Sequence, residues 1–322
     1  MNPTPASDPL SVIGRLAPSP TGAQHVGNAR TYLIAWLSAR ARGGQVLVRI
    51  EDIDSPRVKP GAAAQALDDL RWLGLDWDGD PWEQSSRRSV YGKALAQLQG
   101  REQVYPCTCS RSDVERAASA PHAEHEGPVY PGTCAARRAS DVESLGFAPY
   151  AWRFRLPHRT PTFHDEYRGE IALDLHQTGG DFVVWKTDGT PAYQLAVVAD
   201  DAAQGVTEVI RGDDLLASTP RQLLLYKALG LRPPRFAHVP LVVGPDGHRL
   251  AKRHGDTRLS SLRAAGVRAE ELLGLLAWSC GWLAQPEPIS MPELLPRFAL
   301  APIPRRPFVL TPDLLRDIGY AV

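Results

Sequence analysis

The sequence of 322 residues contains no apolar run long enough to cross a membrane. One of its longest apolar runs, Leu272 to Trp278, is far shorter than the roughly 18 to 20 residues that a transmembrane helix needs. The first ten residues carry no basic side chain and no apolar segment, so they are not a secretory signal. We therefore expect a cytoplasmic protein that has no membrane partner.

The sequence also has no net charge and few cysteines. The chain has 36 Lys and Arg and 36 Asp and Glu residues, so no global positive field attracts nucleic acid, and an RNA partner must bind a local basic surface. Four cysteines are too few for a disulfide scaffold. Three of them, Cys107, Cys109 and Cys134, lie close together in the sequence, which in a reducing compartment indicates a metal site.

The pattern of apolar residues predicts an α/β protein. Val12 to Ala17 is typical of a short strand, the segment from Asn28 has the spacing of a helix, and Val46 to Ile50 is typical of a strand buried on both faces. Strand, glycine-bearing loop, helix and strand form a βαβ unit, which winds right-handed around a parallel sheet. We therefore expect a Rossmann-like, doubly wound parallel sheet.

Changes in composition divide the rest of the chain. The segment 101–190 is expected to be an inserted small α+β subdomain, and within 191–243 the apolar residues 195–198 and 206–210 are expected to be strands. The expected organisation is a flexible leader (1–11), the first half of the Rossmann-like domain (12–100), the insertion (101–190), the second half of that domain (191–243), and a basic loop followed by a short helical C-terminal region (244–322).

A first candidate phosphate site joins the first strand to the first helix. Its sequence, from Arg15 to Asn28, is RLAPSPTGAQHVGN. Helix N-termini attract phosphate, Gly27 leaves the backbone open to a ligand, and His25 can donate a hydrogen bond to a phosphate oxygen. The segment matches neither the dinucleotide-binding nor the P-loop pattern. By spacing alone, a plain structural turn remains an equal alternative.

A second candidate site is the basic loop from Arg249 to Gly255, RLAKRHG. Only five of the 36 cationic residues are lysines, and one of them, Lys252, lies in this loop. A lysine at such a place can meet the charge that develops on a transferring phosphoryl group. A short basic run is more often a solvated surface, so this loop alone does not define a function.

Together and in this order, the two segments resemble the HIGH and KMSKS motifs of class I aminoacyl-tRNA synthetases. Residues 25–28 are similar to the first motif with Asn28 in place of its final histidine. Residues 249–253 are similar to the second, with Lys252 at the matching lysine and Ala251 and Arg253 in place of its two serines. Three further segments resemble the glutamate-specific members of that family, namely 15–22, 49–54 and 205–214. The resemblance covers about residues 12 to 260.

The resemblance implies a glutamate site and an ATP site. Arg15 and Arg211 can each clamp a carboxylate through two parallel hydrogen bonds, and Glu51 can balance the substrate ammonium. Catalysis would fall to His25 and Lys252, which neutralise charge on the phosphates, with Mg²⁺ bound through the nucleotide. The remaining expected contacts are Leu16, Ala17, Pro18, Ser19 and Tyr193 for glutamate, and His25, Gly27, Asn28 and Lys252 for ATP.

The clustered cysteines predict one structural Zn²⁺ site in the insertion. Zn²⁺ prefers four tetrahedral ligands, and three thiolates suit it. The family resemblance points to Tyr130 as the fourth ligand beside Cys107, Cys109 and Cys134, while His122 and His125 are chemically more ordinary alternatives.

The family's ordinary members carry a large helical anticodon-binding region after the lysine loop, whereas 68 residues follow His254 here. The chain is therefore similar to a truncated paralogue, which by resemblance attaches glutamate to the queuosine base at the wobble position of tRNA-Asp. The expected partners are ATP, L-glutamate and tRNA-Asp carrying queuosine, and we expect a monomer. A cationic stretch is expected to follow the RNA backbone, consisting of Arg249, Lys252, Arg253, Arg258 and Arg263.

Two alternatives remain open at this stage. One is a minimal glutamyl-tRNA synthetase that charges a tRNA 3′ end, against which the missing anticodon-binding region argues. The other is a catalytically silent RNA-binding relative, against which the retained residues His25, Lys252, Glu51, Arg15 and Arg211 argue.

Overall fold

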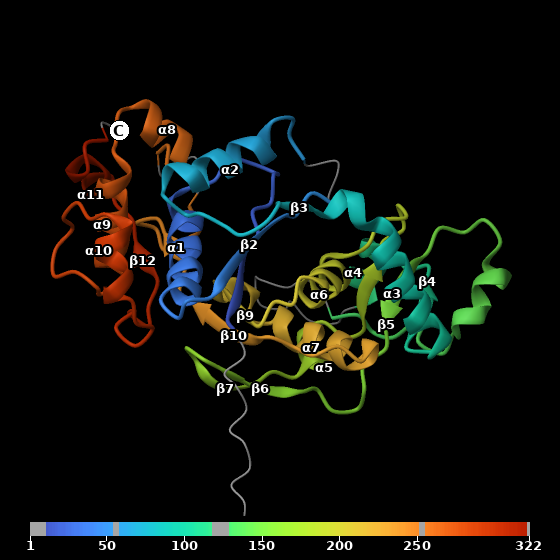
Figure 1. Cartoon of the computed structure of the whole chain (residues 1–322). Coiled ribbons are helices and arrows are strands. Elements are labelled where there is room, and N and C mark those ends of the chain that lie inside the picture. The colour runs from blue at the N-terminus through green and yellow to red at the C-terminus, as the bar shows by residue number, and fades with distance from the viewer. Residues whose placement is uncertain (1–10, 54–57, 118–128, 251–254, 321–322) are drawn as a thin grey trace, which may run out of the picture.

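A mostly parallel sheet forms the centre of the computed structural model, which describes residues 11–53, 58–117, 129–250 and 255–320 (Figure 1). One half has the order β1-β2-β3 and the other β9-β10-β6-β7, with only β7 antiparallel to its neighbour. The halves meet where Thr207 N–H donates to the carbonyl oxygen of Ile13, at 2.9 Å. These strands are β1 (Ile13–Leu16), β2 (Gln45–Ile50), β3 (Trp82–Glu83), β6 (Thr162–Asp165), β7 (Gly169–Ala172), β9 (Glu208–Gly212) and β10 (Arg235–Val239). The predicted α/β class and parallel sheet are confirmed.

Helix α1 (Val26–Arg40) follows β1 and packs against β1, β2 and β9. Leu33 and Leu37 on this helix are fully buried with Val48 of β2. Each fully buried side chain of this kind stabilises the fold by roughly 1.5–3 kcal/mol. This packing fixes the N-terminus of α1 at the carboxyl ends of the parallel strands. The other helices around the sheet are α2 (Ala62–Trp72), α3 (Arg88–Gly100), α6 (Tyr193–Ala203) and α7 (Ser218–Leu229).

One predicted strand is wrong. Residues 195–198 lie inside helix α6 and not in the sheet. Leu195, Val197 and Val198 are all buried, with no more than 1% of their surface exposed. A helix turn that is buried on every side gives a continuous apolar run, and such a short run cannot be distinguished from a buried strand by periodicity.

The segment predicted as an insertion contributes to two sheets. Its own antiparallel sheet consists of β4 (Val104–Cys107), β5 (Ala151–Phe154) and β8 (Phe182–Trp185), beside α4 (Arg111–Ala117). The hairpin β6–β7 instead extends the main sheet next to β10. The predicted domain boundaries stay predictions. The short helices of this segment are η3 (Ala139–Leu145) and α5 (Leu175–Thr178), while η2 (Gln84–Arg87) precedes α3 and η4 (Asp213–Leu215) follows β9.

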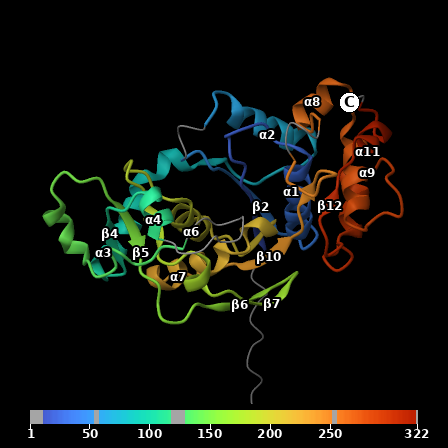
Figure 2. The same ribbon diagram turned by 180° about the vertical axis from the view of Figure 1, so that it is seen from behind.

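The C-terminal helices lie beside α1, on the side away from the cysteine-bearing sheet (Figure 2). They are α8 (Leu259–Ala264), α9 (Ala269–Ser279), α10 (Met291–Leu294), η6 (Leu295–Arg297) and α11 (Pro312–Asp317). A late strand, β12 (Phe308–Val309), pairs in parallel with β11 (Val242–Val243), which precedes the basic loop. Within the described residues, no helix has the length and apolarity needed to cross a membrane.

Candidate active site

A cavity of about 430 Å³ opens at the carboxyl ends of β1, β2 and β9. Ligands of doubly wound α/β proteins bind at this edge of the sheet. Eight of the predicted site residues line the cavity together, although they span positions 15 to 211: Arg15, Ala17, His25, Gly27, Asn28, Glu51, Tyr193 and Arg211. Leu16, Pro18 and Ser19 are not among its lining residues, and Leu16 lies in the apolar core.

The N-terminus of α1 holds His25 in one protonation state. Its Nδ1 accepts hydrogen bonds from the backbone N–H groups of Gly27, at 3.1 Å, and Asn28, at 3.4 Å. Asn28 Oδ1 in turn accepts the N–H of His25, which completes a capping box. Because Nδ1 accepts and burial lowers the pKa of His25, the ring is neutral and its proton is on Nε2. His25 is therefore a hydrogen-bond donor for an anion in the cavity.

Glycine at position 27 keeps this cap in place. A Cβ atom there would lie 3.0 Å from His25 Cε1, so a side chain would displace the imidazole. Glycine is therefore favoured at position 27 both because it leaves room for the His25 imidazole and because it leaves the backbone open to a ligand.

Described residues on both sides of 251–254 lie next to the first motif. Val26 N–H donates to the carbonyl oxygen of Thr257, at 3.0 Å, and Leu259 N–H donates to that of Gln24, at 2.9 Å. Leu250, the last residue described before the lysine, lines the same cavity as His25. Lys252 itself lies outside the described residues. The described chain on both sides of it is thus held next to the first motif.

Arg211 on β9 is a buried cation that forms no ion pair with a carboxylate among the described residues. Its Nη2 donates to Thr219 Oγ1, at 2.7 Å, and to Gln222 Oε1, at 2.9 Å, and its Nε donates to His238 Nε2, at 3.0 Å. All three acceptors are neutral, and Nη1 is buried with no partner among the described residues. Burial lowers the pKa of Arg211. A carboxylate that entered the cavity would satisfy both the charge and the free N–H groups of Nη1.

Arg15 and Glu51 supply two further charges of the cavity, which Asp214 and Arg249 also line. Arg15 Nη1 donates to the carbonyl oxygen of Ile210 at 3.3 Å, and its Nε lies 3.8 Å from Asp201. Glu51 Oε1 lies 3.2 Å from Arg49. Burial raises the pKa of Glu51, while Arg49 and Arg15 oppose that shift. Glu51 thus offers an acidic group beside two arginines, as a zwitterionic ligand requires.

Ser19 and Pro18 support Glu51 instead of lining the cavity. Glu51 N–H donates to the carbonyl oxygen of Pro18 at 3.0 Å, and Ser19 Oγ lies 3.5 Å from the carbonyl oxygen of Glu51. The proline-containing loop after β1 therefore fixes the end of β2.

Sequence reasoning missed several residues of the site. Tyr32 lines the cavity, and its position four residues after Asn28, on the same face of α1, is a signal that could have found it. Burial and the neighbouring Glu51 raise the pKa values of Tyr32 and Tyr193, so both remain protonated donors. Sequence reasoning also missed the three hydrogen-bond partners of Arg211, which are Thr219, Gln222 and His238.

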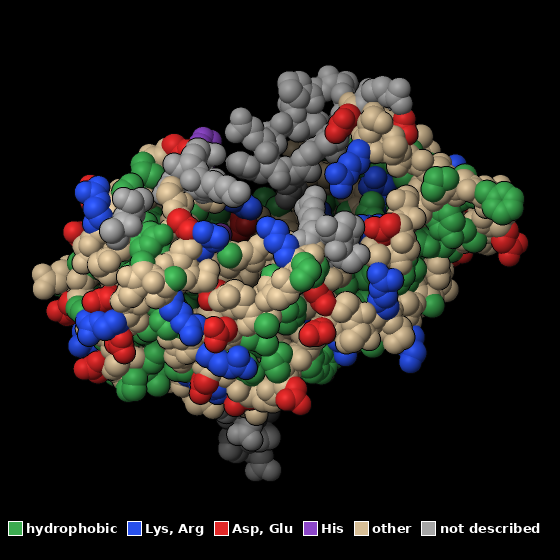
Figure 3. Space-filling model, turned by 90° about the horizontal axis from the view of Figure 1, so that it is seen from above, with side chains coloured by type: hydrophobic (Ala, Val, Ile, Leu, Met, Phe, Trp, Pro, Cys, Tyr) green, Lys and Arg blue, Asp and Glu red, His purple; other side chains and the backbone are tan. Residues whose placement is uncertain are grey.

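The described arginines of the cationic stretch predicted to bind RNA form ion pairs with nearby carboxylates. Each of its described arginines faces a carboxylate: Arg249 pairs with Asp214, Arg258 with Asp256, and Arg263 with Asp68. Acidic and basic side chains are also interspersed over the face seen in Figure 3. Lys252 and Arg253 lie outside the described residues. The described arginines of the predicted cationic stretch therefore have neighbouring carboxylates, and their role in RNA binding stays a prediction.

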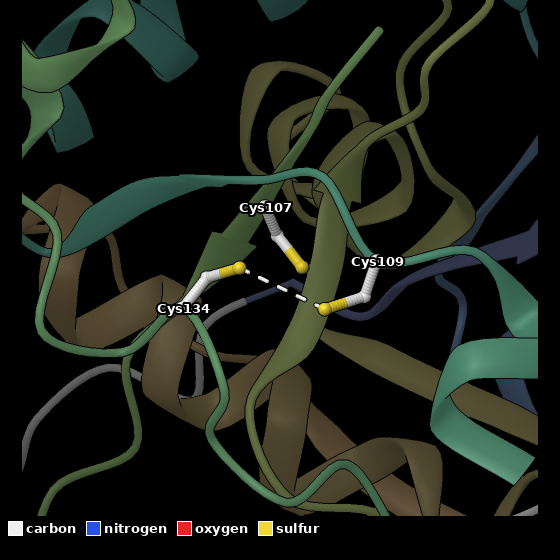
Figure 4. A group of neighbouring side chains, drawn as sticks. All are labelled: Cys107, Cys109 and Cys134. Carbon is white, nitrogen blue, oxygen red and sulfur yellow. Dashed lines mark hydrogen bonds between the residues drawn. The ribbon is translucent and has the colours of Figure 1, made fainter. Parts of the chain in front are cut away.

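A second cluster, remote from the cavity lining, consists of Cys107, Cys109 and Cys134, whose Sγ atoms lie within 4.8 Å of one another. Figure 4 shows the three thiols pointing toward one another, with Cys109 and Cys134 sulfurs 3.7 Å apart. Tyr130 Oη lies 3.4 Å from Cys107 Sγ and accepts the N–H of Cys134 at 2.8 Å. His122 and His125 lie outside the described residues. The described cluster could hold a metal ion.

The fold, the cavity and its lining define a catalytic domain of the class I aminoacyl-tRNA synthetases, and the model of the family "tRNA synthetases class I (E and Q), catalytic domain" matches residues 11–288. The chain is 54% identical over 282 residues to the glutamyl-Q tRNA(Asp) synthetase of Rhodopirellula baltica, covering 84% of this chain and 85% of that protein. It is 52% identical over 310 residues to the glutamyl-Q tRNA(Asp) synthetase of Symbiobacterium thermophilum, covering 92% and 95%.

A solved structure agrees with these relatives. The crystal structure of a glutamate tRNA ligase from Elizabethkingia meningosepticum, in complex with its amino acid, is 27% identical, has a TM-score of 0.82, and matches over 96% of this chain and 69% of that one. This chain therefore belongs to the glutamyl-Q tRNA(Asp) synthetase family of class I ligases.

Proposed function

We propose that this enzyme activates L-glutamate with ATP and transfers the glutamyl group to the queuosine base at the wobble position of tRNA-Asp. The observation that carries the glutamate part is the cavity in which Arg211 lies with Arg15 and Glu51, because Arg211 is a buried cation with no ion pair in the described part of the chain. The names of the two relatives that are more than half identical support the acceptor. The protein is proposed to act as a monomer.

In the first step, an oxygen of the glutamate α-carboxylate attacks the α-phosphorus of ATP, and pyrophosphate leaves. The step needs no general base, because the carboxylate is already ionised, so positioning and charge stabilisation govern the rate. The Nε2–H of His25 would donate to a phosphate oxygen, and Gly27 and Asn28 would bind ATP at the N-terminus of α1. When bound with the nucleotide, Mg²⁺ would neutralise phosphate charge.

In the second step, a hydroxyl of the acceptor attacks the carbonyl carbon of glutamyl-adenylate, and AMP leaves. The amino acid meanwhile stays bound through Arg15, Arg211, Glu51 and Tyr193, with Ala17 beside them. Glutamine would leave a buried guanidinium without its anion, so the cavity would reject glutamine by a large factor.

One specific observation favours a second candidate function, the charging of a tRNA 3′ end. The similarity to the glutamate tRNA ligase structure extends over 96% of this chain. The chemistry of activation is the same in both candidates, and only the acceptor differs.

One assay separates the two acceptors. The protein is incubated with ATP and labelled glutamate, together with tRNA-Asp that contains queuosine, tRNA-Asp that lacks it, or tRNA-Glu. We expect label only in the first sample. Label in tRNA-Glu would instead establish charging of a 3′ end, and absence of glutamate-dependent pyrophosphate exchange would refute the activation step itself.

Replacement of Lys252 with alanine should slow glutamyl-adenylate formation by about 100-fold or more, as expected for loss of one group that stabilises transition-state charge. The affinity for glutamate should change little, because the carboxylate contacts are assigned to other residues. Pyrophosphate exchange measures the first quantity and isothermal titration with glutamate the second. The matched control is Lys59→Ala, a lysine outside both motifs; an unchanged exchange rate in the Lys252 variant would remove the role assigned to that residue.

We further propose that Cys107, Cys109, Cys134 and Tyr130 hold one structural Zn²⁺. Tetrahedral Zn²⁺ with bonds of about 2.3 Å to sulfur separates two thiolates by about 3.8 Å, and the sulfurs of Cys109 and Cys134 are 3.7 Å apart. Burial would raise the pKa of Cys134, but hydrogen bonds from Thr108 and Cys109 bring it to about 7. Tyr130 Oη is the nearest oxygen donor described at the cluster.

Replacement of Cys134 with serine should remove most of the zinc and lower Tm by about 5 °C or more, since domains of this size lose roughly 2–4 °C for each kcal/mol. Glutamate activation at 25 °C should stay within about twofold, because the cluster does not line the cavity. Zinc is counted by atomic emission, one per chain being expected in the wild type. Cys280→Ala serves as the control, a buried cysteine outside the cluster that should keep its zinc. Equal zinc in both variants would contradict the assigned ligand set.

A further inference from the structure

Three buried residues on neighbouring strands form a chain of hydrogen bonds that ends at the substrate cavity. Arg211 on β9 lies opposite His238 on β10 in the parallel register, and Asp165 ends the next strand, β6. The side chains of His238 and Asp165 are fully buried. His238 Nδ1 lies 2.6 Å from Asp165 Oδ2, and its Nε2 lies 3.0 Å from Arg211 Nε. Neither His238 nor Asp165 lines the cavity.

The proton positions in this chain follow from its donors. A guanidinium Nε–H can only donate, so His238 Nε2 must accept, and Thr219 Oγ1 lies 3.1 Å from the same nitrogen. The imidazole proton is therefore on Nδ1 and is donated to Asp165. Burial lowers the pKa of His238 to about 4, so the ring stays neutral at physiological pH, although Asp165 opposes the shift.

Asp165 is fixed by the backbone around it. Its Oδ1 accepts the N–H groups of Tyr167, at 3.0 Å, Arg168, at 2.8 Å, and His238, at 3.2 Å. These bonds leave Oδ2 for the imidazole. By accepting the Nδ1 proton, the Asp165 carboxylate selects the tautomer of His238 that keeps Nε2 unprotonated.

We propose that His238 and Asp165 are positioning residues that hold Arg211 ready for a carboxylate of the substrate while leaving its charge unneutralised. A carboxylate in direct contact with Arg211 would orient it equally well but would compete with the substrate. The neutral imidazole fixes Nε, Thr219 and Gln222 fix Nη2, and Nη1 remains without a partner among the described residues. The inference rests on the proposed function, because it assumes that the cavity binds glutamate.

The substitution Asp165→Asn tests the tautomer. The amide oxygen is expected to keep the three backbone N–H groups, which places the amide NH₂ opposite His238 Nδ1. Nδ1 must then accept, the proton moves to Nε2, and two donors face each other at Arg211. We expect KM for glutamate to rise about 10-fold or more while kcat changes less than about threefold, because binding in the ground and transition states is lost together.

The control is to make Asp165→Asn in an Arg211→Lys variant, because a lysine has no Nε–H to donate to His238. In that background, addition of Asp165→Asn should change KM for glutamate by less than about twofold. An equal rise of KM in both backgrounds would overturn the positioning role, because the effect would not pass through Arg211. KM and kcat are measured by glutamate-dependent pyrophosphate exchange on the full chain.

A second measurement needs no variant. Nitrogen-15 NMR of the wild-type protein at pH 7 should show His238 protonated at Nδ1 and unprotonated at Nε2, and the reverse pattern would overturn the proposal. If the wild type does not bind glutamate, the proposed function fails. If it binds glutamate and folded Asp165→Asn binds it equally well, only the positioning role fails.

Discussion

Arg211→Ala should raise KM for glutamate about 100-fold or more while leaving the free energy of unfolding unchanged or slightly higher. The loss of binding follows because truncation of one partner of a buried charge pair costs about 2–5 kcal/mol. Stability should not fall, because Arg211 is buried without an ion pair among the described residues and its three neutral acceptors offset only part of its desolvation in the free enzyme. Removal of the cation relieves that cost.

Pyrophosphate exchange gives KM, and urea unfolding without substrate gives the stability. Saturating glutamate should stabilise the wild type but not the variant, since a ligand stabilises only the state that binds it. A variant with normal KM would disprove the glutamate site. A strong loss of stability without ligand would show that the arginine is structural.

Arg49→Ala, unlike Arg211→Ala, should lower the free energy of unfolding by about 3–5 kcal/mol. Arg49 is fully buried, donates to Asp201 at 2.6 Å, and lies 3.2 Å from Glu51 and 3.9 Å from Asp200. Alanine would remove the cation closest to Asp201 and Glu51, leaving them Arg15. Burial already raises the pKa of Glu51, and loss of Arg49, which opposes that shift, would raise it further. A buried carboxyl of this kind destabilises the fold once it ionises, so the deficit should be large at pH 7 and should shrink as the pH falls toward 4.

Urea unfolding at pH 4, 5.5 and 7 measures this profile. The control is Arg263→Ala, whose partner Asp68 and whose own side chain are each about half exposed, so its loss should be below about 1 kcal/mol at every pH. A deficit in the Arg49 variant that does not depend on pH would point to lost packing instead of unpaired carboxylates.

The comparison of Arg211 with Arg49 also shows what the sequence could predict. Both are arginines at the ends of apolar strands, and the motif surrounding Arg211 was sufficient to predict its place at the cavity. The sequence could not show that Arg49 pairs with Asp201, 152 positions away, whereas Arg211 forms no ion pair among the described residues. Arg263 gives the same lesson, since its acidic partner lies 195 positions away.

The fold was predicted best where its local pattern was strong. The spacing around α1 and the apolar run of β2 were sufficient for the first βαβ unit. Residues 195–198 were assigned to the wrong element because the surrounding protein buries every side of that helical turn. His238 could not be foreseen as a neighbour of Arg211, because that contact depends on the register between β10 and β9.

The strand β12 has a consequence for the order in which the enzyme is completed during its synthesis. Phe308 N–H donates to the carbonyl oxygen of Leu241 and Leu310 N–H to that of Val243, so β11 receives these bonds only after residues 308–310 have been made. Arg15, Glu51 and Arg211 of the proposed amino-acid site are translated long before. A nascent polypeptide thus contains these residues before the strand that enters the lysine loop can gain its hydrogen bonds from β12.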